Sequence, residues 1–405
     1  MSLVASVKRE ATALRADGKG RSLAVIAGVW GVLLGTRMIY PVLLPYFRET
    51  FGLSLSVAGL LVTVLWLGSA VGQFPGGVLA DRYSERSVMT VGAAVVAAAV
   101  LVVVAAPTAI ALFVSTALVG LGQSLYPIAR ITILADIYPD RIGSALGVTM
   151  ATGDLGQTVL PPVAGTIAAA VAWQAGLGVV APLLLVGAAA LWVLLPRTVD
   201  SGDGDAGAAA GTVSGSTARR VLGELRRPNL VFVAFIFFLY ILVWQSFTGF
   251  YPTYLVEEKG LASSTASGLF SLFFAAGILV KPLAGGAYDR IGFRWSLVLA
   301  LSAPAVGFAV LPVVEGTIEL VAITALVSTM LGSGAITQSY FSEAFPESVR
   351  GTGLGVVRTV TATLGAAGPV VFGVVADRGY FDEGYWLLAG LVAVVIVLTL
   401  RLPEQ

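Results

Sequence analysis

The sequence predicts an all-α polytopic membrane protein with twelve transmembrane helices in two pseudo-symmetric six-helix bundles. Three observations predict this fold class: an apolar composition, a series of apolar stretches of membrane-spanning length, and a repeat between the two halves. Hydrophobic residues make up 57% of the chain and charged residues 12%, whereas soluble domains have about 45–50% and about 25%. The mean hydropathy is +0.91. A chain of 405 residues with this composition has more apolar surface than one water-soluble core buries, so lipid must cover much of it.

The apolar stretches have the length that a membrane requires. A transmembrane helix needs about 20 mostly apolar residues, each rising about 1.5 Å. Charged or Gly/Pro-rich breaks separate twelve such stretches, which we place at 22–46, 55–80, 87–106, 108–134, 144–168, 172–195, 229–253, 263–287, 295–313, 317–341, 352–375 and 384–402.

The positive charges predict the orientation of these spans. Lys and Arg are enriched in cytoplasmic loops of membrane proteins. If the N-terminus is inside, most of the 24 Lys and Arg residues are cytoplasmic, and Arg48, Lys259 and Arg378 lie outside. We therefore expect a multi-pass protein of the plasma membrane with both termini in the cytoplasm.

The same reading predicts four parts of the chain. The long polar gap between the sixth and seventh spans is rich in Gly, Ala and Ser at its start and has four arginines around three apolar residues at its end. The latter pattern is typical of a short amphipathic helix at an anionic membrane surface. The expected parts are a cytoplasmic N-terminal tail (1–21), an N-terminal bundle (22–196), a cytoplasmic linker with a short amphipathic helix (197–228) and a C-terminal bundle (229–405).

The composition also excludes several classes of function. The chain has no cysteine and no histidine, which removes disulfides, thiol nucleophiles, imidazole bases and the usual zinc sites. The sequence has no P-loop, so ATP bound to this chain does not drive its work. We expect no enzyme activity, cofactor or metal. A net charge of +1 gives no sign of a nucleic-acid partner. The expected partners are membrane lipids and a small molecule, and nothing requires an oligomer, so we expect a monomer.

The two halves of the chain match at one fixed offset. The segment GGVLADRYSER, residues 76–86, aligns with AGGAYDRIGFR, residues 284–294, so that Gly77 pairs with Gly285 and Asp81 with Asp289, each 208 positions apart. Six spans, a linker and six further spans are therefore a duplication. This organisation is typical of a transporter that binds its solute between the repeats.

This repeated segment resembles the signature of the major facilitator superfamily, Gly-x-x-x-Asp-Arg-x-Gly-x-Arg between the second and third spans. The chain is similar to that family over its whole length. The first copy consists of Gly77, Asp81, Arg82 and Arg86, with Ser84 in place of the second glycine, and the second of Gly285, Asp289, Arg290, Gly292 and Arg294. The resemblance implies a cytoplasmic gate, in which Asp81 meets the start of span eleven and Asp289 the start of span five. A loop that only fixes the topology is the alternative.

Two further loops share an order of acid, aromatic residue, proline and arginine. They run from Asp136 to Arg141 and from Glu343 to Arg350. The family often has this pattern after spans four and ten, so the resemblance implies that these four residues belong to the same gate.

Two departures weaken one reading of the family resemblance. Drug-efflux antiporters often carry an arginine in span four, where this chain has Thr116. They also carry Gly-Pro-x-x-Gly-Gly in span five, and here Leu160, Pro161, Ala164 and Gly165 keep only part of it.

Ionisable residues inside the expected spans are functional candidates, because an isolated charge in a bilayer is costly. Arg37, Asp154, Lys281 and Arg358 lie in spans one, five, eight and eleven, and Arg130 lies near the inner end of span four. Lys281 has an alternative role, since a long side chain can extend to the membrane surface. Asp154 has two main readings: it neutralises Lys281 or Arg37, or it titrates and couples protons to transport.

The basic residues resemble a pattern found in anion carriers of the family. The segment from Lys281 to Gly286 resembles their basic-Pro-x-x-Gly segment, although Gly277 replaces the acid of monocarboxylate carriers. Those carriers also use a basic residue in span one, where Arg37 stands. Oxalate/formate exchangers have basic groups in the spans of Lys281 and Arg358.

Three intramembrane cations against one carboxylate favour an anion as the solute. Gln245 occupies the repeat position of Arg37, so Trp244, Gln245 and Thr248 are expected to line the cavity, and Tyr126 lines the path or bonds across helices. The predicted function is transport of a small organic or inorganic anion, with proton coupling left open. The alternative is a proton antiporter that exports drugs or other lipophilic compounds.

Overall fold

The computed structural model describes residues 14, 19–196, 223, 227–346 and 350–402. This part of the chain consists of α-helices, short 3₁₀ turns and connecting loops, with no β-strand. The all-α prediction is therefore confirmed. Most of the expected tail (1–21) and linker (197–228), including the proposed amphipathic helix, lies outside the described residues.

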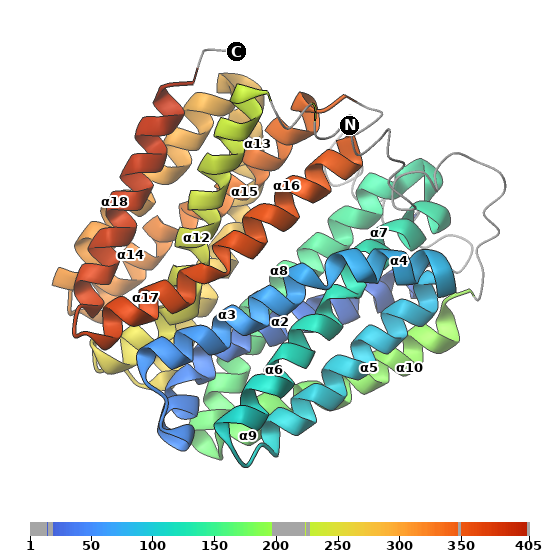
Figure 1. Cartoon of the computed structure of the whole chain (residues 1–405), viewed down its shortest axis with the longest axis horizontal. Coiled ribbons are helices and arrows are strands. Elements are labelled where there is room, and N and C mark those ends of the chain that lie inside the picture. Colours follow the sequence, from blue (N-terminus) through green and yellow to red (C-terminus); the bar gives the residue numbers. More distant parts are fainter. Residues whose placement is uncertain (1–13, 15–18, 197–222, 224–226, 347–349, 403–405) are drawn as a thin grey trace. The chain divides into compact units, whose positions relative to one another are not determined.

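Within each half of the sequence, the helices follow one another with short connections (Figure 1). Those of the first half are α2 (Lys19–Phe51), α3 (Leu55–Val71), α4 (Gln73–Tyr83), α5 (Glu85–Val104), α6 (Ala109–Ser124), α7 (Tyr126–Ile137), α8 (Ile142–Ala170), α9 (Trp173–Gly178) and α10 (Val180–Leu194). Those of the second half are α12 (Pro228–Glu257), α13 (Ser263–Val310), α14 (Thr317–Ser328), α15 (Gly332–Ala344), α16 (Arg350–Gly365), α17 (Ala367–Asp377) and α18 (Phe381–Leu400).

Each of the predicted spans is helical over most of its length. Nine continuous helical segments of the described chain are long and apolar enough to cross a membrane. This number is smaller than twelve for three local reasons. The segment Ser263–Val313 contains two predicted spans, which join at the non-helical Gly292. The span at 55–80 is divided between α3 and α4. The third reason concerns α8, which has 29 residues but is less apolar because it contains Asp154, Gln157 and several glycines and threonines.

The chain forms two compact units. Unit 1 comprises residues 1–37, 68–160 and 177–212, and unit 2 comprises residues 38–67, 161–176 and 213–405. Helices α2, α3, α8 and α9 contribute residues to both units.

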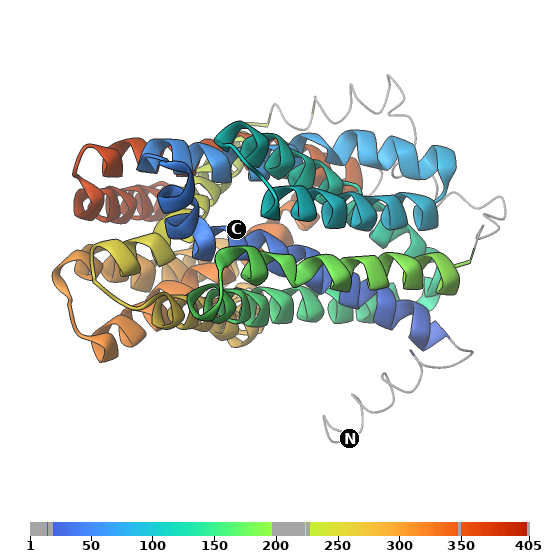
Figure 2. The ribbon, with the colours of Figure 1, turned by 90° about the horizontal axis from the view of Figure 1, so that it is seen from below.

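In unit 1, helices pack closely because glycines allow their backbones to approach. Helix α5 lies against α6 and α10 (Figures 1 and 2). Helices α2 and α8 meet where a Cβ atom on Gly31 would lie 2.6 Å from the Thr152 carbonyl oxygen, and one on Gly35 would lie 2.6 Å from that of Gly156. Small residues four positions apart are typical of close helix pairs in membranes.

Unit 2 has an aromatic core. The ring of Phe247 lies 4.6 Å from that of Tyr251, 5.1 Å from that of Phe273 and 5.3 Å from that of Phe308. All four side chains are buried. Phe273 and Phe308 belong to α13, so these rings join α12 to α13, and α12 also lies against α16, α17 and α18.

The duplication is also visible in the turns. Helix α2 is followed by Gly52 with φ of 64°, and α12 is followed by Gly260 with φ of 63°. Both glycines take the left-handed conformation that ends many helices and that other residues adopt at a cost. The two positions are 208 residues apart, the same offset as in the sequence repeat.

We predict that Gly156→Ala destabilises the protein by about 1–3 kcal/mol, because its added methyl group overlaps the backbone of Gly31. The control is Gly147→Ala on the same helix, where a Cβ atom meets nothing within 4 Å. That substitution is expected to be neutral or stabilising by up to about 1 kcal/mol. Thermal unfolding of both variants in detergent tests the packing, and equal melting temperatures would contradict it.

Candidate functional site

Arg37 is held in unit 1 by two uncharged side chains from other helices. Its Nε donates to Oε1 of Gln123 on α6 at 2.9 Å, and its terminal nitrogen donates to Oγ of Ser69 on α3 at 2.6 Å. Gln123 is itself fixed, since its Nε2 donates to the Leu33 carbonyl oxygen at 3.1 Å. These bonds orient the guanidinium, and an oriented guanidinium suits recognition of a carboxylate.

Sequence reasoning identified Arg37 but not its supports. Gln123 was one of several polar residues in the spans, and Ser69 had no feature that distinguished it. The signal for Gln123 in the sequence is its position inside an apolar span, and the structure shows that only 1% of its surface is exposed. A fully buried glutamine in a span requires a partner.

Tyr126 belongs to a second polar group of unit 1. Its ring stacks on Trp30 with 5.9 Å between the centroids and 12° between the planes, and its hydroxyl donates to the Ile26 carbonyl oxygen at 2.9 Å. The guanidinium carbon of Arg130 lies 4.3 Å from the centre of the Trp30 ring, and Arg130 donates to the hydroxyl of Thr149. Of the two predicted roles for Tyr126, these contacts favour bonding across helices.

Asp154 lies on α8 in unit 1 and is half-buried. Its Oδ1 accepts a hydrogen bond from Gln157 Nε2 at 3.4 Å, and its backbone carbonyl accepts one from Thr158.

The candidates of unit 2 differ in exposure. Lys281 on α13 is half-buried, and Arg358 on α16 is exposed. Gln245 on α12 has only 2% of its surface exposed. Within the described part of the chain, its Oε1 and the Nε1 of Trp244 have no hydrogen-bond partner. Trp244 packs edge-on against Trp66, with 5.2 Å between the ring centroids.

The first signature loop keeps its backbone shape without its glycine. Ser84 has φ of 138° and is the one residue other than glycine with positive φ among those described. At the repeat position, Gly292 has φ of 71°. The Ser84 hydroxyl accepts a hydrogen bond from the Ser87 backbone N–H at 3.3 Å, which caps the start of α5.

The arginines that close the two loops contact aromatic rings. Arg86 is buried, lies 4.3 Å from the ring centre of Trp192 and donates to the Leu195 carbonyl oxygen at 3.2 Å. It therefore binds the C-terminal end of α10, where carbonyl groups attract a cation. Arg294 lies 5.3 Å from the ring centre of Trp295.

The other proposed gate residues are described in part. Glu343 accepts a hydrogen bond from the Tyr288 hydroxyl at 2.7 Å. Six further residues lie on helices or in a helical turn: half-buried Gly285 and exposed Arg82, Asp136, Arg141, Asp289 and Arg290. Gly77, Asp81 and Arg350 are helical, and the side chains of Asp81 and Arg350 lie outside the described part.

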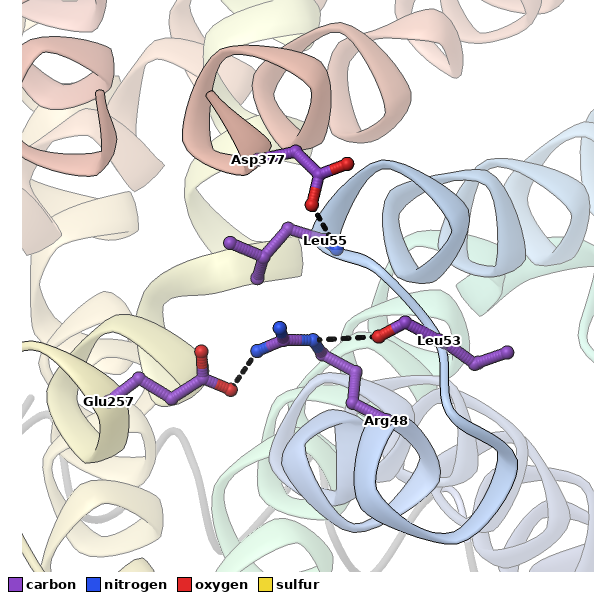
Figure 3. A network of polar contacts seen from close by, with 5 residues as sticks. All are labelled: Arg48, Leu53, Leu55, Glu257 and Asp377. Atoms are coloured by element: carbon purple, nitrogen blue, oxygen red, sulfur yellow. Dashed lines mark hydrogen bonds and ion pairs between the residues drawn. The ribbon is translucent and has the colours of Figure 1, made fainter. Parts of the chain in front are cut away.

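A further polar network lies in unit 2 and joins the first half of the sequence to the second (Figure 3). Arg48, in the last turn of α2, forms an ion pair with Glu257 at the end of α12 and donates to the Leu53 carbonyl oxygen at 3.3 Å. Asp377, the last residue of α17, lies at the start of α3. Its carboxylate accepts hydrogen bonds from the backbone N–H of Leu55 at 3.0 Å and from the hydroxyl of Ser56 at 2.8 Å.

Comparison with known proteins agrees with this architecture. The chain is 26% identical to the hexuronate transporter of Bacillus subtilis (strain 168), across 91% of this chain and 90% of that protein. It is 25% identical to the probable sulfoacetate transporter SauU of Cupriavidus necator, across 92% and 91% of the two chains. The solved structure of the nucleoside transporter NupG superposes with a TM-score of 0.79 at 14% identity, and the match covers 94% of this chain and 98% of that one.

The family itself is shown by a match that extends over most of the sequence. The sequence pattern of the Major Facilitator Superfamily matches residues 25–367 and again residues 233–405. The fold, the repeated signature loop and these matches agree. The chain belongs to the Major Facilitator Superfamily and is a multi-pass membrane transporter rather than an enzyme.

Proposed function

We propose that this transporter moves a small organic anion and that Arg37 binds its negative group. The observation that carries the proposal is the guanidinium of Arg37, held by Gln123 and Ser69. A guanidinium presents parallel N–H groups that match the two oxygens of a carboxylate or sulfonate. The relatives support an organic acid as the solute, because one is named for hexuronate and another for sulfoacetate.

The cost of a charge in a membrane supports the same role. A span tolerates an arginine when the side chain faces a partner or a water-filled path. The Gln123 amide oxygen and the Ser69 hydroxyl accept hydrogen bonds from Arg37 and hold its guanidinium in one orientation. We propose that the negative group of the solute binds this oriented guanidinium. Lys281 and Arg358 are the further basic groups that we propose for the same solute, and Gln245 and Trp244 the uncharged ones.

We further propose that transport proceeds by alternating access in the cell membrane, with both termini cytoplasmic, and that a single chain suffices. In this mechanism the bundles 22–196 and 229–405 open alternately to the two sides. The network of Arg48, Glu257 and Asp377 then lies outside and keeps that side closed. The two signature loops close the cytoplasmic side.

We predict that anions stabilise the purified protein against heat. Glucuronate and glucose form a matched pair, because they differ only in the carboxylate. A ligand at about 100 times its Kd stabilises a folded protein by about 2.7 kcal/mol. We expect this shift for an organic acid of the glucuronate, sulfoacetate or lactate type, its loss in Arg37→Gln, and no change in Arg378→Gln, which alters an exposed arginine. Stabilisation by cationic dyes alone, equal in both variants, would instead favour the drug exporter.

Asp377→Asn is predicted to loosen the network at the start of α3. The substitution removes a negative charge from a helix N-terminus, a contact worth about 0.3–1 kcal/mol, so the population of the opened network should rise about two- to fivefold.

The chain has no cysteine, so Thr63→Cys gives a single label site. Thr63 is buried and its hydroxyl accepts from the Val370 N–H. The rate of maleimide labelling measures opening; Glu383→Gln, an exposed acid on α18, is the control. Equal rates in all three proteins would disprove the role.

Proton coupling, if present, is proposed to use Asp154. Asp154→Asn is then expected to abolish solute accumulation driven by a pH gradient in proteoliposomes, while exchange of internal for external solute continues. Glu49→Gln, which alters an exposed acid of α2, should leave both activities unchanged. A loss of both activities together with a loss of about 3–5 kcal/mol in stability would assign Asp154 to a buried ion pair instead.

A further inference from the structure

A second arginine of unit 1, Arg130 on α7, is placed as carefully as Arg37. Only 7% of its surface is exposed. Its guanidinium lies 4.3 Å from the centre of the Trp30 ring, and one of its terminal nitrogens donates to the Thr149 hydroxyl. The indole ring and the hydroxyl come from α2 and α8 and carry no charge. They therefore fix the plane and direction of the guanidinium.

The ring that supports Arg130 is itself fixed. Trp30 stacks on Tyr126, and the Tyr126 hydroxyl donates to the Ile26 carbonyl oxygen one turn earlier on α2. A Cβ atom on Gly153 of α8 would lie 3.0 Å from the Trp30 Nε1 atom, so α8 lies against this edge of the indole. Trp30 nevertheless remains half-buried rather than buried, so part of its side chain is exposed.

Arg130 and Arg37 both take part in contacts between the same two helical segments, α2 and the segment formed by α6 and α7. Trp30 and Arg37 are seven residues apart on α2, and Gln123 and Arg130 are seven residues apart along α6 and α7. Leu125, which links α6 to α7, has helical φ and ψ of −70° and −21°. Seven residues are nearly two turns, so each pair shares a face with a separation of about 10.5 Å along the axis. The pairs Arg37–Gln123 and Trp30–Arg130 are thus two successive contacts, with the charge on α2 in one and on α7 in the other.

We propose that Arg130 is a second anion-binding position and that the transported anion moves between Arg130 and Arg37. This inference rests on the proposed function, in which the solute is an anion. Its carboxylate or sulfonate accepts hydrogen bonds from the edge of the Arg130 guanidinium while the indole covers the face. Two positions of moderate affinity allow passage better than one tight site, because each must also release the anion.

Iodide provides a test that does not require the solute to be known, since it quenches tryptophan fluorescence on contact. The Trp30 contribution is the difference between the wild type and Trp30→Phe. We expect iodide to quench this contribution more strongly than caesium does. One charge at about 4 Å in water is worth about 1 kcal/mol, so Arg130→Gln should lower the iodide quenching constant about fivefold. Arg130→Lys keeps the charge and should retain most of the quenching. Arg37→Gln removes the charge of the other arginine and should also retain most of the iodide quenching.

The neutral quencher acrylamide reports changes in exposure and should act equally on all variants. Equal quenching by iodide and caesium in the wild type would overturn the proposal, and this measurement does not depend on the folding of any Arg130 variant. An unchanged iodide constant in Arg130→Gln would also overturn it and leave Arg130 as a brace between helices. Neither result bears on the thermal-shift test of Arg37, so failure of this inference is distinguishable from failure of the proposed function.

Uptake into proteoliposomes gives a second readout. With the anion found in the thermal-shift panel, Arg130→Lys is expected to raise KM several-fold with little change in kcat, because an ammonium keeps the charge but loses the planar pair of donors. A purely structural arginine would lower stability and leave KM unchanged.

Discussion

The charge of Arg37, placed within a membrane span, is the constraint around which unit 1 is organised. A guanidinium within a membrane span is tolerated only where polar groups or water reach it. Gln123 and Ser69 meet that requirement, and each in turn fixes a helix. Gln123 also bonds to the backbone of α2 through the Leu33 carbonyl, so α6 cannot slide along α2 without breaking bonds at both ends of one amide. The glycine contact between α2 and α8 at Gly31 and Gly156 brings the third helix against the same part of α2.

Much of this architecture follows from the sequence because it depends on patterns that recur along the chain. Apolar length identifies the helical spans, and the repeated Gly-x-x-x-Asp-Arg segment identifies the family. The division of the chain into domains at 22–196 and 229–405 remains a prediction. So does the assignment of the charged residues to a solute site, since it depends on which way each side chain points.

The contacts that hold the candidate site together were harder to predict for a physical reason. Ser69 is one serine among many in apolar spans, and its role depends on α3 facing Arg37. Asp377 and Glu257 are ordinary acidic residues at helix ends, and 321 residues separate Asp377 from Ser56. For Tyr126 the sequence left two roles open, lining the path or bonding across helices, and the structure adds the bond from its hydroxyl to the backbone of α2. Such pairings are set by packing of distant segments, which no local pattern encodes.

The unusual backbone at Ser84 has a consequence for the history of the duplication. The first loop has Ser84 where the second has Gly292, and both positions have positive φ. A residue other than glycine in such a conformation costs about 1–3 kcal/mol. The hydrogen bond from the Ser87 N–H to the Ser84 hydroxyl returns a similar amount, since N-caps contribute about 0.5–2 kcal/mol. Serine is thus one of few residues able to replace this glycine at little net cost. The two copies could therefore diverge in sequence here while selection on the shape of the loop continued unchanged.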